Sequence, residues 1–277
     1  MKPTSASPGA RALAASLREL RTTRGKGLRE LARMVRILPQ LVSAWEKGQR
    51  VASPEDVARL LGALQVDDAT YDRMMRLARR AKDDNWLDSN PSDLPPVLSG
   101  ILEYERTASR IFNWEVAIVP GLLQTADYAR ELLSNSQITL EQADHRLVAR
   151  LGRQRILHGR DPVRFSAIID EAVIRREIGG PGSMSDQIDH LLRMADLANV
   201  TLRIVPGDVG YHPGLAGSFV LYEFAALSPI VYLEHHHASS FLHDNEGVGR
   251  YRALAKLVDQ EALSEADTRA LLRDAAR

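Results

Sequence analysis

The sequence has no cysteine, no net charge and no long apolar run, and each absence excludes a class of protein. Without cysteine, the chain of 277 residues forms neither disulfides nor thiolate metal sites. No apolar stretch approaches the roughly 20 residues that a membrane helix needs. Residues 1–10 also lack the apolar core of a signal peptide. We therefore expect a soluble, cytoplasmic protein with no membrane partner.

The net charge of zero hides an uneven distribution. The chain holds 36 basic and 36 acidic side chains, but residues 1–50 contain 11 Lys and Arg against 3 Asp and Glu. Residues 86–277 contain 19 basic and 26 acidic side chains. A chain of this length usually forms two domains. The basic N-terminal part is suited to bind phosphate, and the acidic C-terminal part repels it.

Apolar spacing predicts an all-α bundle over residues 1–82. Residues 28–35 carry apolar side chains along one helical stripe. Pro39 fits the first turn of the next helix, which ends near Gly48. Ser53 is followed by proline and two acids, the signature of a capped helix start. Two short helices joined by a tight turn, on a basic segment, are typical of proteins that read duplex DNA.

Three segments carry a family resemblance: GLRELARMVR, LPQLVSAWEKG and SPEDVARLLGAL. They resemble the lambda-repressor-like (XRE-type) helix-turn-helix domains. The resemblance implies that the helix from Pro39 to Lys47 lies in the major groove of DNA. Three positions depart from the family pattern: Arg36 replaces a common turn glycine, Leu38 a capping serine or threonine, and Leu28 a frequent glutamine.

The exposed face of that helix supplies the candidate contacts. Amides and hydroxyls match the donors and acceptors of base edges in the major groove, so we assign base contact to Gln40, Ser43 and Ala44. Basic side chains would neutralise phosphates and set affinity more than specificity. The candidates for phosphate contact are Arg29, Arg36, Lys47 and Arg50. The alternative is that these charges form only a solvated helical face.

Residues 83–96 are polar, contain proline and lack periodicity, which predicts a linker. From residue 97 the pattern becomes mixed and predicts an α+β domain over 97–277, with a small sheet flanked by helices. The predicted strands are 163–169, 200–205, 218–224 and 230–234. The predicted helices are 101–111, 126–133, 140–157, 184–197, 246–260 and 264–277.

This second part also resembles a known family. The segments VPGLLQTADYAREL, DEAVIRREIGGP and GYHPGLAGSFVLYEF are similar to the C-terminal domain of actinobacterial helix-turn-helix regulators of the WhiJ-like, antitoxin-like class. The resemblance runs through about residues 97–275. It implies a transcriptional regulator that often works with a small companion protein encoded beside it. It supplies neither a ligand nor a catalytic residue.

Histidines give weak signals for a metal or ligand site. His235 and His237 would share one face of a strand, as two metal ligands can. An exposed or partly packed strand edge is the favoured explanation, and we expect no metal and no cofactor. His212 lies in a glycine-flanked loop, where it could gate a ligand pocket or stabilise a turn.

Charged clusters in the second domain have structural explanations as well. Asp170 and Glu171 could act as a general acid and base. Pairing with Arg175 or Arg176 is the simpler reading, and no nucleophile or nucleotide fingerprint accompanies them. A group of arginines could bind an acidic partner or a second DNA segment, but pairing within the domain is favoured: Arg146, Arg150, Arg153 and Arg155. We expect no enzyme activity.

Two functions remain. In the first, the protein is a sequence-specific transcriptional regulator whose C-terminal domain forms a homodimer and receives a partner protein or a small-molecule effector. In the alternative, the C-terminal domain carries the main activity, as a small-molecule-binding or hydrolytic module targeted to DNA. A deep pocket with converging polar groups favours the alternative, and a broad apolar surface favours the first.

Overall fold

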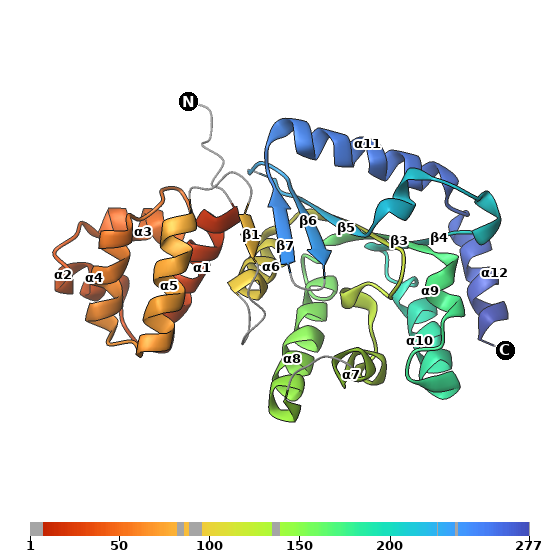
Figure 1. The fold of residues 1–277 in the computed structure, drawn as a ribbon, viewed down its shortest axis with the longest axis horizontal. Coiled ribbons are helices and arrows are strands. Elements are labelled where there is room, and N and C mark those ends of the chain that lie inside the picture. Colours follow the sequence, from red (N-terminus) through yellow and green to blue (C-terminus); the bar gives the residue numbers. More distant parts are fainter. Residues whose placement is uncertain are drawn as a thin grey trace. The chain divides into compact units, whose positions relative to one another are not determined.

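The computed structural model describes residues 8–81, 86–88, 96–134, 139–225, 227–235 and 238–276 (Figure 1). The chain forms two compact units, which confirms the multidomain prediction. Unit 1 comprises Met1–Tyr104, Ala226–Ile230 and His235–Asp244. Unit 2 comprises Glu105–Ala225, Val231–Glu234 and Asn245–Arg277. Within the described segments, no helix is both long and apolar enough to cross a membrane.

Unit 1 begins with five helices, as the apolar spacing predicts. They are α1 (Pro8–Thr23), α2 (Leu28–Met34), α3 (Pro39–Glu46), α4 (Pro54–Leu64) and α5 (Asp68–Arg80). Each contributes apolar side chains to one core, among them Leu13, Leu31, Val42, Leu61 and Met74, all of which are buried. The N-terminal all-α helix-turn-helix bundle is therefore confirmed.

Local signals set the helix ends in this bundle. The Asp56 N–H donates to the Ser53 hydroxyl at 3.1 Å, which caps α4. Pro39 occupies the first turn of α3, where its missing N–H costs no hydrogen bond. After α3 the chain turns at Gly48, whose φ of 66° is in the left-handed region that glycine adopts most readily. These three predictions from the sequence are confirmed.

An ion pair between the half-buried Arg21 and the buried Glu46 joins α1 to α3. The Arg21 guanidinium donates from Nε and Nη2 to the two carboxylate oxygens of Glu46, at 2.7 and 2.8 Å. A third donor of Arg21, Nη1, reaches the Lys26 carbonyl oxygen at 2.8 Å. This bidentate geometry is specific to arginine. The pair fixes the end of α3 against α1.

Further elements of unit 1 come from distant parts of the chain. They are β1 (Trp86–Asp88), most of α6 (Pro96–Thr107) and β7 (Ala238–Leu242), with β1 antiparallel to β7. Arg11 of α1 is buried, donates to the Ser228 carbonyl oxygen at 3.2 Å, and lies over the Tyr104 ring at 5.8 Å. Of the predicted linker 83–96, only residues 86–88 and 96 are described.

Unit 2 is built on a mixed sheet in the order β6–β5–β2–β3–β4. Its strands are β2 (Arg110–Glu115), β3 (Arg164–Asp170), β4 (Val200–Val205), β5 (Phe219–Glu223) and β6 (Ile230–His235). Strands β2, β3 and β4 are parallel, and β5 runs antiparallel to β2. The α+β prediction is confirmed, with its four strands present as β3 to β6.

Helices lie on both faces of this sheet (Figure 1). One face is covered by α7 (Ala126–Ser134), α8 (Leu140–Arg153), α9 (Glu171–Arg175) and α10 (Gly180–Met194). The other face carries α11 (Asn245–Glu261), while α12 (Glu265–Ala275) packs against β4 and α10. Ser264 caps α12 by accepting from the Asp267 N–H at 3.1 Å, as its sequence predicts.

Several elements differ from the predictions. The helix expected over 101–111 ends at Thr107, and β2 begins at Arg110. Strand β2 lies in a sheet that carries helices on both faces, and its burial does not alternate strictly, so the alternation that marks a half-exposed strand is missing. The sequence also failed to predict β1 and β7, which are only three and five residues long.

Candidate nucleic-acid interface

The turn between α2 and α3 closes on an arginine in a left-handed conformation. Arg36 has a φ of 55°. Its N–H donates to the Arg33 carbonyl at 3.2 Å, and the Ile37 N–H donates to the Ala32 carbonyl at 2.9 Å. This pair of bonds is the Schellman motif, in which glycine is the usual left-handed residue. The turn therefore forms with an arginine whose side chain is exposed.

Helix α3 buries one face and exposes the other. Val42 and Trp45 are buried in the bundle core. Gln40 is exposed on the opposite side, and Ser43 and Ala44 are half-buried. All three residues assigned to base contact therefore lie on the accessible part of the helix, with Gln40 the most accessible of them.

The basic residues of the bundle fall into two groups. Arg21 is held by Glu46, and Arg24 donates to the Leu64 and Gln65 carbonyl oxygens. The four residues assigned to phosphate contact are all exposed, and none has a carboxylate partner among the described residues: Arg29, Arg36, Lys47 and Arg50. A cation without a protein partner keeps its full charge for a phosphate.

Two apolar side chains just before α3, Met34 and Leu38, are exposed. Neither was predicted from the sequence to be a site residue. Leu38 is 70% exposed and precedes α3 without a side-chain cap. Met34, at the end of α2, is 48% exposed. Apolar side chains in the major groove contact the methyl group of thymine. The comparison with the family pattern identified Leu38 only as a missing helix cap. The exposure of its side chain becomes visible only in the structure.

The histidine candidates of the second part are separated in the structure. His212 is buried, with its ring 5.5 Å from that of Trp114 and its Nε2 4.0 Å from an Asp170 oxygen. His235 is exposed at the end of β6, and His237 lies outside the described residues. The described residues contain no cluster of three metal-binding side chains.

The charged candidates make contacts within unit 2. Glu171 pairs with Arg175 at 2.8 Å and accepts from the Gly207 N–H, which lowers the pKa of its carboxyl group. Asp170 caps α9 through the Ala172 N–H. Arg153 forms a buried bidentate pair with Glu105, at 2.6 and 2.9 Å. For Glu171 and Arg153, the expected pairing within the domain is confirmed.

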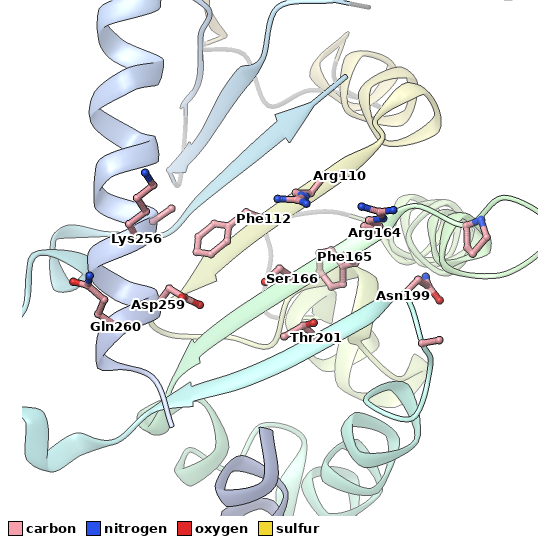
Figure 2. Close-up of a pocket in the computed structure, with 13 residues that line it drawn as sticks. Arg110, Phe112, Arg164, Phe165, Ser166, Asn199, Thr201, Lys256, Asp259 and Gln260 are labelled. Carbon is pink, nitrogen blue, oxygen red and sulfur yellow. The ribbon is translucent and has the colours of Figure 1, made fainter. Parts of the chain in front are cut away.

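A groove opens on the face of the sheet that carries α11. Its volume is about 740 Å3, and its lining comes from β2, β3, β4 and α11. Figure 2 shows Arg110 and Phe112 of β2 beside Arg164 and Ser166 of β3, with Lys256 and further α11 side chains at one side. His212 does not line this groove. The groove could not be predicted from the sequence, because the pairing of β2 with β3 brings its walls together.

Comparisons with known proteins match both parts of the chain. Residues 12–74 match a family model described as a helix-turn-helix domain, which supports DNA as a partner of an XRE-like regulator. No curated protein matches the chain. Residues 98–274 match a family model described as a domain of unknown function, DUF5753. Since this second match covers more than half of the chain, the protein belongs to the DUF5753 family.

Proposed function

We propose that the protein is a cytoplasmic transcriptional regulator that reads double-stranded DNA with α3. The observation that carries this proposal is the surface around α3. Gln40 is exposed there, and the four proposed phosphate contacts have no carboxylate partner among the described residues: Arg29, Arg36, Lys47 and Arg50. Base-edge donors and acceptors beside free cations meet the two needs of a duplex reader, sequence readout and phosphate neutralisation.

In this proposal the C-terminal domain receives the signal. The groove on the unit 2 sheet is of the size that small ligands occupy, which favours a small-molecule effector. The only carboxylate in its described lining, Asp259, is held by Arg203 at 2.6 Å, so binding is better supported than hydrolysis. A companion protein and the WhiJ-like, antitoxin-like class rest on the sequence resemblance.

Two substitutions test the role of α3. The duplex is one selected by the full chain from a random pool, and binding is measured by fluorescence anisotropy. Gln40→Ala should cost about 1–3 kcal/mol against the selected duplex and little against a scrambled one. Arg29→Ala should weaken both and lower the salt slope by about 1. Arg18→Ala, an exposed arginine on α1, is the control. Wild-type affinity for both test variants would refute the assignment.

The proposed homodimer has its own test. Repressor-like domains read paired half-sites, and a dimer places two copies of α3 on one duplex. Sedimentation equilibrium of the full chain at micromolar concentration should give twice the mass of one chain. A single-chain mass both free and bound to the selected duplex would remove the dimer and leave DNA reading by one copy.

A further inference from the structure

The floor of the groove in unit 2 carries two neighbouring arginines, Arg110 and Arg164, whose positive charges have no acidic partner among the described residues. Arg110 and Arg164 are register partners in the parallel pair β2 and β3, so their side chains leave the same face of the sheet side by side (Figure 2). Both are exposed. Like charges directly opposite each other on neighbouring strands are destabilising.

Two carboxylates of the surrounding elements, Glu223 and Asp259, already have arginine partners. Glu223 of β5 is the register partner of Arg110 on its other side, but it accepts from Arg252 Nε at 3.1 Å. Asp259 of α11 is paired with Arg203. Among the residues that the structure describes, neither Arg110 nor Arg164 has an acidic partner, and Lys256 adds a third exposed cation to the same lining.

The rest of the lining is suited to an organic molecule. Phe112 lies next to the arginine pair and is half-buried, so part of its ring remains accessible. Ser166 and Thr201, which are register partners, add hydroxyl groups further along the groove. An aromatic face beside a cationic pair binds molecules that join a planar apolar body to an anionic group.

We infer that this groove binds a small organic anion, either a phosphate monoester or a carboxylic acid, with a planar apolar body. Arg110 and Arg164 hold the anionic group, and Phe112 contacts the body. The inference rests on the proposed function in one respect, since it locates the effector that the C-terminal domain would receive. Its own content is the ligand class and the residues that bind it.

Phenyl phosphate is the probe, used with the full chain in isothermal titration calorimetry and thermal unfolding. It should bind and raise the melting temperature, whereas benzyl alcohol, which lacks the anion, should not. Arg110→Gln and Arg164→Gln should each weaken binding about tenfold or more. Arg193→Gln on α10 alters an exposed arginine outside the groove and should bind as the wild type does.

The same variants report on folding. Removing one of two like charges should leave the melting temperature without ligand unchanged or higher, so lost binding cannot be attributed to lost structure. Wild-type affinity in both glutamine variants, equal binding of benzyl alcohol, or no binding at millimolar concentration would each overturn the inference. Gln40→Ala, which tests DNA reading, should leave phenyl phosphate binding intact, so the two proposals fail separately.

Discussion

Arg36 combines a strained backbone conformation with the phosphate contact that we propose for its side chain. It occupies the same place in its turn as Gly48 does after α3, and both adopt a positive φ. A left-handed conformation costs a residue with a side chain roughly 1–2 kcal/mol, and it costs glycine almost nothing. The arginine side chain at this position is exposed, as the proposed phosphate contact requires.

Replacing Arg36 by glycine and by alanine separates these two effects. Both variants lose the guanidinium, so both should bind DNA more weakly and with a lower salt slope. Only Arg36→Gly relieves the backbone strain, so it should be more stable than Arg36→Ala by about 1 kcal/mol in urea unfolding. Gln65, with a φ of 49° after α4, is the control. Gln65→Gly should stabilise the protein without weakening DNA binding, and equal stability of the Arg36 pair would contradict this account.

Glu115 should make the stability of the protein depend on pH. Burial raises the pKa of its carboxyl group to about 7, with a smaller contribution from the charge of Glu234. A pKa that is higher in the folded than in the unfolded state contributes to the free energy of unfolding at low pH. This contribution is complete below the unfolded-state pKa, near 4.5, and is lost as pH rises through 7. The neutral acid is thus the form that the folded protein favours.

In the wild type, the Asn113 side-chain amide donates to a Glu115 carboxyl oxygen at 3.0 Å. Glu115→Gln places an amide oxygen there, which can accept the same hydrogen bond. The variant should match the wild type in melting temperature at pH 5 and exceed it at pH 8. Glu177→Gln, at an exposed position, should follow the wild-type profile at both values. If Glu115→Gln lowered the melting temperature at pH 8, the ionised carboxylate would be the favoured form.

The position of helix α3 depends on its ion pair with α1. Removing one partner of a buried pair leaves an uncompensated charge and costs about 3–5 kcal/mol, whereas replacing both by apolar residues is nearly neutral. Arg21→Met should therefore destabilise the protein by about 3 kcal/mol, and Arg21→Met with Glu46→Leu should recover most of it. Chemical unfolding measures both. A double variant no better than the single one would show that the pair is worth more than its apolar replacement.

Elements with local signals could be predicted, and elements that depend on distant partners could not. Pro39, Ser53 and Ser264 mark helix starts by capping chemistry that lies within a few residues. Strand β1 is only three residues long and finds its partner, β7, across about 150 residues of chain. The same division applies to the sites. Gln40 is recognisable from a helical motif, whereas the pairing of Arg110 with Arg164 arises only from the sheet register.

The chain passes repeatedly between the two units. The changes fall at residues 104/105, 225/226, 230/231, 234/235 and 244/245. Unit 1 therefore needs the segment around Ser228, which precedes β6 in the sequence, and β7, which follows it. A cut near residue 97 removes β1 and α1 from these partners.

Hydrogen exchange should detect that loss. In residues 97–277 expressed alone, the β7 amides that pair with β1 in the full chain should exchange at least about tenfold faster. The amides of β3, paired on both sides by β2 and β4, should keep their protection and serve as the internal control. Unchanged exchange in β7 would mean that this strand is held without β1.

The interleaved path of the chain also bears on how such proteins could diversify. Exchange of a DNA-reading module by recombination is simplest when one junction separates it from the rest. Here a new N-terminal segment would have to bring its own counterpart of β1 and of the Arg11 contact to the Ser228 carbonyl. We therefore expect new DNA preferences to arise by substitution on the exposed side of α3, with the two parts of the chain inherited together.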